Sequence, residues 1–563
     1  MTDHLPNSSL PSAVDMETDV LIVGAGPVGG SLAVELALRG IRVQIVEQLP
    51  EIGSWWTRAM NCNKRSMEHL RRWGIAERLK DINFVPKGWP GNVTLVDTLG
   101  GRQITSVCAE GLGWQRVLPD ASEDALWVTQ GQLQQVVLEK AQQLGVMINF
   151  SSKAVSMTRR DDGTACVGVE SDGVTRNIGA RYVVGCDGAR SFVRETLGMT
   201  YQGNGALSRV VAVFFDAPDL LASMRQRGIT DAVMYVVSKP EVRGIARLIQ
   251  GHRWELQINL ADDATENDID PDAVVRALVG PGIDYKLERT FPFSYFDLVA
   301  DRFGDEFGFI AGDAAHIIPP LGGHNLNLGI GDAVNLGWKL AHVLRGWAGD
   351  AILDSYSVER RAMVLRTKGE VLQNHARLYS SFGRLAEWMT IEGDDADTHA
   401  RREQMGQDIG NHLYPQWVSD GIVLDLRYPD SPIVACDQAA SEHVPYDPAR
   451  NTPCAVPGHR APMYRDNAGA PLYDRFGPEY TLLDLAPASD AGRVAAQRLT
   501  AAGLPVAHLS VTDESLRSLF GRPLTLIRPD QHVAWRGESL PADVEEFVHL
   551  LTGRARVVSR NAA

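Results

Sequence analysis

A glycine-rich loop followed by an acidic residue is the first group whose residue types and spacing could bind a ligand. The loop consists of Gly24, Ala25, Gly26, Pro27, Val28 and Gly29. It lies between an apolar run at 19–23 and a predicted helix that ends near Gly40, and a second apolar run at 41–46 leads to Glu47 and Gln48. Such glycines let the backbone approach a pyrophosphate, the helix N-terminus supplies positive potential, and the acid accepts hydrogen bonds from ribose hydroxyls. The pattern predicts a dinucleotide site, without distinguishing NAD from FAD.

Two later segments also place polar residues at the ends of apolar runs. In the first, a strand-like run at 181–186 leads into Asp187 and Gly188. In the second, an apolar run from 309 ends at Gly312 and Asp313, where a carboxylate is suited to the hydroxyls of a ribityl chain. A turn with two prolines and two glycines then leaves room for a flat ring against the backbone.

A helix is predicted to begin at about Asn325, directly after that turn. The residues around its start are Pro320, Gly323, His324, Asn325, Leu326 and Asn327. The N-terminal amides of this helix would face the pyrimidine end of a flavin, where the reduced anionic form carries its charge. We expect His316, between the two parts of this segment, to be a structural histidine rather than a catalyst.

Together, the three segments resemble the FAD signatures of the single-component flavoprotein aromatic hydroxylases, which include para-hydroxybenzoate hydroxylase and phenol hydroxylase. The resemblance implies that one FAD contacts the three segments through these residues: Gly24, Gly26, Pro27, Val28, Gly29, Glu47, Gln48, Asp187, Gly188, Gly312, Asp313, Pro320, Gly323, His324, Asn325, Leu326 and Asn327. It also implies that Arg58 lies over the flavin's linker and that Gln130 opens a helix and reaches the ribityl chain. The alternatives are a solvated arginine and a surface glutamine.

One position departs from the family pattern. The family usually has glycine where this chain has Asn325. Asparagine tolerates left-handed backbone geometry better than other side chains, so we expect the turn to be preserved with Asn325 in that geometry.

The function that the resemblance implies is hydroxylation of a phenol-type aromatic substrate. NADH or NADPH would reduce the flavin, O2 would add at C4a, and the flavin C4a-hydroperoxide would transfer oxygen to the ring, so the cofactor carries the chemistry. No side chain is assigned as a catalytic acid or base. The alternatives are a Baeyer-Villiger or epoxidising oxygenase on a polycyclic polyketide and a non-enzymatic FAD-binding interaction protein. A flavin halogenase is disfavoured because its Trp-x-Trp-x-Ile-Pro segment is not found.

Alternating apolar stretches between residues 201 and 300 predict antiparallel strands at 210–215, 233–237, 244–249 and 254–260. In the resembled family such a sheet covers the substrate above the flavin. Candidates for the substrate pocket are Trp56, Tyr235, Arg247, Gln257 and Pro320, although outward-facing strand residues and packed aromatics explain most of these side chains equally well.

The predicted fold class is α/β. A discontinuous Rossmann-type FAD-binding domain (17–90, 120–200 and 301–345) carries an inserted β-sheet substrate domain (91–119 and 201–300). A helical segment follows at 346–415, and its Arg-rich stretch at 359–361 is expected to be solvated. Residues 416–563 are expected to form a linker and a thioredoxin-like domain without a redox cysteine pair, because the sequence contains no cysteine beyond Cys454. Residues 1–16 are expected to be a disordered tail.

Composition limits the remaining possibilities. The 563 residues include 55 Lys and Arg against 70 Asp and Glu, and this net charge of -15 argues against nucleic acid or an acidic membrane as a partner. The six cysteines show no metal-ligand spacing, so no metal site is predicted. The apolar stretch at 20–38 contains glycines, Pro27 and Glu35 and is better explained as strand, turn and helix than as a membrane span. We expect a cytoplasmic protein that could form a homodimer.

Overall fold

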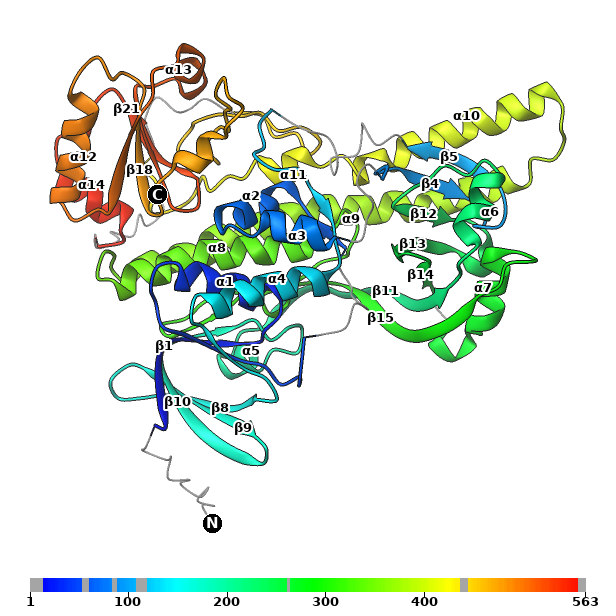
Figure 1. Cartoon of the computed structure of the whole chain (residues 1–563), viewed down its shortest axis with the longest axis horizontal. Helices are drawn as coiled ribbons and strands as arrows, with labels where there is room; N and C mark the ends of the chain where they lie inside the picture. The colour runs from blue at the N-terminus through cyan, green and yellow to red at the C-terminus, as the bar shows by residue number, and fades with distance from the viewer. Residues whose placement is uncertain are drawn as a thin grey trace, which may run out of the picture.

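The structure of the protein, a computed structural model, describes residues 14–52, 60–83, 89–107, 119–260, 264–435 and 444–554. Figure 1 shows two sheets at opposite sides of the molecule, joined by long strands and a long central helix, and a third sheet near the C-terminus. The polar ends of strands and helices between these sheets form the candidate site.

The first sheet carries the glycine-rich loop. Its strands are, in order across the sheet, β7 (Met147–Asn149), β2 (Val43–Val46), β1 (Met16–Val23), β10 (Val174–Gly185), β9 (Ala165–Ser171) and β8 (Lys153–Arg159), with β16 (Gly308–Ile310) paired to β10. The strands β7, β2, β1, β10 and β16 are parallel, so their C-terminal ends meet at one edge. This is the arrangement of a dinucleotide-binding fold.

Helices and a small ribbon complete this domain. They are α1 (Pro27–Ala37), α2 (Lys64–Arg72), α3 (Ala76–Ile82), α4 (Gln130–Gln143) and α5 (Phe192–Thr196), with the paired strands β3 (Asn61–Cys62) and β6 (Leu126–Trp127). The prediction of a disordered tail over 1–16 is wrong at its end, because Met16 opens β1 and pairs with Ile178. The rest of that segment, up to residue 13, lies outside the described residues.

The second sheet confirms the four predicted strands and adds others to them. Its order is β17 (His316–Ile317), β15 (Lys286–Ala300), β11 (Tyr201–Asp216), β14 (Arg253–Asn259), β13 (Gly244–Gln250), β12 (Met234–Val237), β4 (Val93–Val96) and β5 (Gln103–Val107). The helices α6 (Leu220–Gln226) and α7 (Pro271–Val279) lie beside it at the far end of the molecule (Figure 1). The short strand β17 lies just after Asp313, so the sheet is hydrogen-bonded to the segment predicted to contact the flavin.

Three helices follow the second sheet: α8 (Asn325–Leu344), α9 (Ala351–Met389) and α10 (Ala396–Leu413), and after them the short α11 (Asp420–Leu424). The predicted helix start at Asn325 is confirmed. The helix α9 reaches the second sheet, where the Tyr379 hydroxyl donates to Ser208 Oγ of β11 over 2.6 Å. Within the described residues, no helix is both long enough and apolar enough to cross a membrane.

The C-terminal sheet has the order β19 (Val506–Ser510), β18 (Tyr480–Asp484), β20 (Leu524–Ile527) and β21 (Val533–Gly537), with α12 (Ala491–Ala501), α13 (Glu514–Phe520) and α14 (Val544–Leu551). Only β18 and β19 are parallel; the β18–β20 and β20–β21 pairs are antiparallel. This is the strand arrangement of a thioredoxin-like domain, as the sequence predicts.

The prediction that the charges at 359–361 are solvated is wrong for two of the three residues. Glu359 and Arg360 are 1% and 2% exposed. The Glu359 carboxylate pairs with Lys339 over 2.7 Å and with Arg528 of the C-terminal domain over 2.6 Å. Burial is tolerated because each charge has an opposite partner, and no local sequence pattern shows partners that are so distant along the chain.

Candidate functional site

The glycine-rich loop has the geometry that close approach of a ligand requires. Gly24 has a φ of +107°, and a Cβ added there would lie 2.4 Å from the Cys186 carbonyl oxygen. A Cβ at Gly29 would lie 2.1 Å from the carbonyl oxygen of Gly24. In contrast, a Cβ at Gly26 would meet no described protein atom within 4 Å. Two of the glycines are therefore needed by the fold, whereas the open side at Gly26 is available to a ligand.

The start of α1 is electrostatically prepared for an anion. Pro27 is its first residue, and in the described residues no side chain caps the helix and no acidic residue lies in its first turn. The first amides of a helix lack partners within the helix and carry partial positive charge. A pyrophosphate can supply both the acceptors and the negative charge.

Glu47 lies at the end of β2, next to this loop. Its carboxylate accepts hydrogen bonds from the Ala25 amide over 2.8 Å and from the Leu49 amide over 2.9 Å. On the other side of the loop, Gln134 of α4 donates to the Ala25 carbonyl over 2.9 Å. The acidic residue is thus positioned by the loop itself, and Gln48 beside it is exposed.

Asp187 lies at the end of β10, where the sheet turns toward α5. Its Oδ2 accepts from the Val193 amide over 3.2 Å, and its Oδ1 is buried without a hydrogen-bond partner among the described residues. Burial raises the pKa of this carboxyl group above its usual value of 3.8. An unsatisfied buried carboxylate oxygen is costly and fits a hydroxyl donor from a ligand. Gly188 follows with a φ of +80°, as a tight turn requires.

The Asp313 segment converges on the same region through α8. Gly312 has a φ of +63°, and a Cβ there would approach the Val28 side chain to 2.9 Å. The turn through Pro320 and Gly323 leads to His324, the residue before α8. As at α1, no side chain caps α8 within the described residues, and its first turn carries no acidic residue. Two helix starts without a side-chain cap, those of α1 and α8, therefore belong to this region.

Asn327 anchors the start of α8 to the first domain. Its Oδ1 accepts from the Asn63 amide over 2.9 Å and from the Ser66 hydroxyl over 2.7 Å, and its Nδ2 donates to the Gly323 carbonyl over 2.8 Å. All of its polar side-chain atoms are used in this way, which indicates a role in shaping the turn. Leu326, the preceding residue, is half-buried.

The expectation for Asn325 is wrong in its physical reason. The residue does not adopt the left-handed conformation; it is the first residue of α8, and the positive φ angles of the described residues other than glycine belong to Ser151, Asp172 and Gln531. Its side chain instead bridges His316 Nδ1 and Asp313 Oδ1, each over 2.8 Å. Asparagine is accommodated here by its amide group rather than by its backbone.

Arg58 and Gln130 are the two remaining candidates for contacts with the cofactor. Arg58 lies outside the described residues, as does Trp56. Gln130 is the first residue of α4, as predicted, with Thr129 capping the helix through a reciprocal contact with Gln132.

The substrate-pocket candidates divide between the two faces of the second sheet. Tyr235 is excluded from the face toward the first domain: its ring packs on Trp254 in a separate core beneath α6 and α7, and its hydroxyl accepts from the Ala232 amide over 3.0 Å. The prediction that Tyr235 lines the substrate pocket is therefore wrong. Side chains alternate along the strand, and Tyr235 points into this separate core. Pro320 is exposed at the turn before α8.

Arg247 and Gln257 lie on the other face and share one carboxylate. Arg247 donates to Glu255 Oε2 over 2.6 Å, and Gln257 donates to Glu255 Oε1 over 2.8 Å. The Tyr295 hydroxyl of β15 donates to Gln257 Oε1 over 3.4 Å. Tyr295 continues a row with Phe293 and Phe291, with ring centroids separated by 5.8 and 6.1 Å. This face therefore presents an aromatic row beside a neutralised ion pair.

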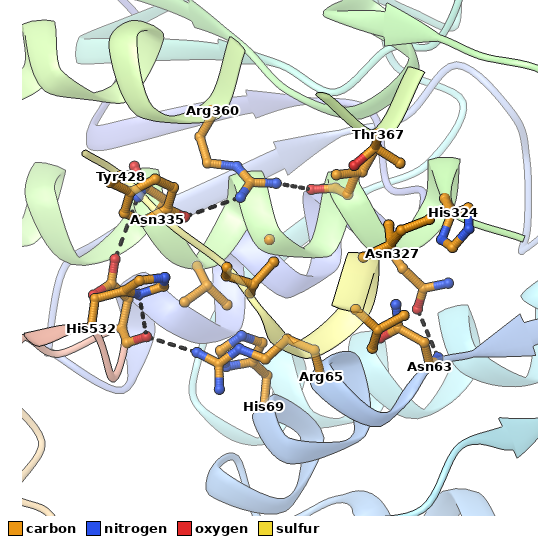
Figure 2. A pocket seen from close by; sticks show the side chains of 17 residues that line it. Asn63, Arg65, His69, His324, Asn327, Asn335, Arg360, Thr367, Tyr428 and His532 are labelled. Atoms are coloured by element: carbon orange, nitrogen blue, oxygen red, sulfur yellow. Dashed lines mark hydrogen bonds and ion pairs between the residues drawn. The ribbon is translucent and has the colours of Figure 1, made fainter. Parts of the chain in front are cut away.

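A polar cavity of about 40 Å³ lies behind the start of α8 (Figure 2). His324 and Asn327 are at one end, and His532 of the C-terminal domain is at the other. The buried atoms His324 Nε2, His532 Nε2 and Thr367 Oγ1 have no hydrogen-bond partner among the described residues. Such a space suits ordered water, which satisfies donors and acceptors alike. Burial lowers the pKa of His324 to about 4, so this side chain is neutral beside α8.

Sequence patterns do not show the buried ion pairs around the site, with one exception. His316, Asp332 and Arg360 form a buried chain of ion pairs directly behind Asp313 and Asn325, with a distance of 2.8 Å at each link. Glu35 on α1 is buried and pairs with Arg39 and Arg72, each over 2.8 Å. The Glu35–Arg39 spacing of four residues is the one signal that could have been used.

Fold and site together define an FAD-binding protein with a Rossmann-type sheet and a second, larger sheet. The family model described as an FAD binding domain matches residues 17–368. The chain belongs to this family.

Named relatives agree with that assignment. Aklavinone 12-hydroxylase RdmE of Streptomyces purpurascens is 31% identical over 94% of this chain and 97% of its own length. A 4-methyl-5-nitrocatechol 5-monooxygenase of a Burkholderia species is 30% identical over 95% of this chain and 97% of its own length. Among solved structures, the rebeccamycin biosynthetic enzyme RebC with reduced flavin superposes with a TM-score of 0.85 at 29% identity, covering 96% of this chain and 99% of that chain. The protein is an FAD-dependent monooxygenase.

Proposed function

We propose that this enzyme hydroxylates a phenol-type aromatic substrate, using O2 and either NADH or NADPH. When bound, FAD supplies the electron transfer from the nicotinamide to O2 and the oxygen activation at its C4a carbon. The chain's own residues bind the cofactor, orient the aromatic ring and exclude water, which would otherwise favour release of hydrogen peroxide. The names of the relatives support the substrate class: one is a hydroxylase of aklavinone and another is a monooxygenase of a nitrocatechol.

The proposed cofactor contacts follow from the donors and acceptors of the site. The start of α1 receives the pyrophosphate beside the open side of Gly26, and Glu47 accepts from ribose hydroxyls. Asp313 accepts from the ribityl chain, and the uncapped start of α8 faces the pyrimidine ring. The remaining proposed cofactor contacts are Gln130, at the start of α4, and Asp187, after the end of β10.

The observation that carries the proposed substrate class is the continuity between the aromatic row and the flavin segment. Strand β15 bears Phe291, Phe293 and Tyr295 on one face, and near its end it pairs with β17, with Leu298 opposite Ile317. Phe291 and Phe293 pack against the main hydrophobic core, on the side of the first domain. An aromatic substrate can therefore stack on this row while a polar group of the substrate meets Tyr295 or Gln257.

The test is a panel of phenols added to the purified, FAD-reconstituted enzyme, with NADH and NADPH oxidation and peroxide measured in parallel. We expect at least one phenol to stimulate oxidation and to yield a ring-hydroxylated product whose new oxygen comes from isotopically labelled O2. Oxygen inserted next to a ketone or across a double bond would replace this proposal with a Baeyer-Villiger or epoxidising reaction. FAD binding without stimulated turnover for any phenol of the panel would overturn the proposed phenol-type substrate.

A matched pair of variants tests the aromatic row. Phe293→Ala removes a ring from the proposed substrate face. Phe296→Ala removes a ring from the opposite face of the same strand, because side chains alternate along a strand. We expect the first to raise KM and the fraction of reductant lost as peroxide, with the second near wild type. Equal effects from both would overturn the placement of the substrate on this face.

A further inference from the structure

Asp313 stands at the end of a chain of side chains that begins on α9. Arg360 Nε donates to Asp332 Oδ1, Asp332 Oδ2 contacts His316 Nε2, His316 Nδ1 contacts Asn325 Oδ1, and Asn325 Nδ2 donates to Asp313 Oδ1. Each of these distances is 2.8 Å. Arg360, Asp332 and His316 are buried.

The partners of His316 determine where its protons are. The Asp313 carboxylate only accepts, so the NH2 group of Asn325 faces it and Oδ1 of Asn325 faces His316. The Ile318 amide also donates to this Oδ1, over 3.4 Å, which holds the amide in the same orientation. The other ring nitrogen faces Asp332, a carboxylate that also accepts from the Gly312 amide over 3.1 Å. Both ring nitrogens therefore face acceptors, and both donate when His316 is an imidazolium.

We propose that Asn325 is a positioning residue that transmits the protonation state of His316 to Asp313, so that the affinity for FAD depends on pH. The inference rests on the proposed contact between Asp313 and the ribityl chain. When His316 loses its Nδ1 proton, two lone pairs face each other at Asn325 Oδ1. Rotation of the amide relieves this repulsion but places Oδ1 against the Asp313 carboxylate, which then loses its hydrogen bond from Asn325 Nδ2.

The charges around His316 set the direction of the effect. Asp332 of α8 faces its Nε2, with Arg360 of α9 behind it, Asp313 lies beyond Asn325, and the apolar ring of Phe303 packs at 6.1 Å. Burial alone would lower the pKa of His316, but the charge of Asp332 outweighs burial and raises the pKa above its usual value of 6.5. The oriented state of Asp313 is thus complete below the usual histidine pKa of 6.5, and it is lost as pH rises through the raised pKa of His316.

The experiment measures the Kd for FAD by flavin fluorescence between about pH 6 and pH 9, using the full-length protein. We expect the wild-type Kd to rise about tenfold across this range, as loss of one charge-assisted hydrogen bond implies. Asn325→Gly, which has the residue usual in the resembled family, should bind FAD more weakly at low pH and show a flat profile. Asn325→Asp should bind more weakly still, because a second carboxylate would face Asp313. His508→Gln, which removes a histidine on β19, is the control and should keep the wild-type profile.

Asp313→Ala separates the two levels of the proposal. If it leaves the Kd at low pH unchanged, the proposed contact between Asp313 and FAD is wrong. The protonation of His316 then cannot act on FAD binding through Asp313. If it weakens binding while wild type and Asn325→Gly keep parallel pH profiles, the site stands and the transmission through Asn325 is wrong. Circular dichroism and the unfolding midpoint of each variant show that a change in Kd reflects the site and not a loss of fold.

Discussion

Glu68 on α2 and Arg460, which precedes the C-terminal sheet, form a buried ion pair in which Arg460 Nη2 lies 2.7 Å from Glu68 Oε1. Arg65 donates to the other carboxylate oxygen over 2.8 Å and to Gln531 of the C-terminal domain over 2.6 Å. The Ser122 amide also donates to Glu68 Oε1, over 3.0 Å. A single carboxylate thereby joins α2 to the C-terminal domain.

Removing this carboxylate should cost much of the stability of the interface. Glu68→Gln leaves Arg65 and Arg460 buried without their anion, and we expect a loss of about 3–5 kcal/mol in unfolding free energy. Thermal and urea unfolding followed by tryptophan fluorescence would measure it. Glu77→Gln, which breaks the exposed pair with Lys80 on α3, is the control and should change the midpoint little. Similar midpoints for both variants would show that the buried pair does not stabilise the protein.

The Glu68 carboxylate also predicts how the stability of the protein depends on pH. Burial alone would raise the pKa of Glu68, but the charges of Arg460 and Arg65 outweigh burial and hold the pKa below its usual value of 4.5. Its contribution is therefore complete above the pKa of the unfolded chain and is lost as pH falls through the lower pKa of the folded state. We expect the difference in unfolding midpoint between wild type and Glu68→Gln to be constant near neutral pH and to shrink below about pH 4.5. A difference that stays constant into strong acid would contradict this linkage.

Gly26 and Gly29 of the loop predict opposite outcomes for a substitution by alanine. At Gly26 the backbone is extended, with φ of -62° and ψ of 174°, and no described atom lies near an added Cβ, so Gly26→Ala should fold normally. The methyl group would occupy the side that the pyrophosphate approaches, and we expect FAD affinity to fall at least about tenfold. At Gly29 the Cβ meets the Gly24 carbonyl, so Gly29→Ala should lower the stability of the apoprotein by about 1–3 kcal/mol.

Calorimetric unfolding of the apoproteins and FAD titration distinguish the two glycine variants. A Gly26→Ala protein that binds FAD like wild type would show that the ligand does not approach the loop from its open side. A Gly29→Ala apoprotein as stable as wild type would show that the close backbone contact relaxes without cost.

Much of this architecture follows from local sequence patterns. The glycine loop, the strands of the second sheet and the start of α8 are readable because turns, alternation and helix starts depend on neighbouring residues. The environment of Asn325 was not readable, because its partner His316 is fixed by Asp332 and, through it, by Arg360 on another helix. The same limit applies to Tyr235, since alternation predicts that a strand has two faces but not which face meets the substrate. The local pattern around Glu359 indicates a solvated charge, because its partner Arg528 belongs to the C-terminal domain.

The ion pair on the proposed substrate face predicts a change in specificity. Glu255 neutralises Arg247 with contacts of 2.6 and 3.0 Å, so the face offers no net positive charge to a substrate. Glu255→Gln keeps the shape of the side chain but leaves the guanidinium uncompensated, and it replaces one of the two accepting oxygens with an NH2 donor. We expect the ratio of kcat/KM for a carboxylated phenol to that for the neutral phenol to rise about tenfold, which corresponds to about 1.4 kcal/mol of differential binding. Arg247→Leu in the Glu255→Gln background removes the cation and should return the ratio to its starting value. If the double variant keeps the raised ratio, the new preference does not come from Arg247, and the polar side of this face does not contact the substrate.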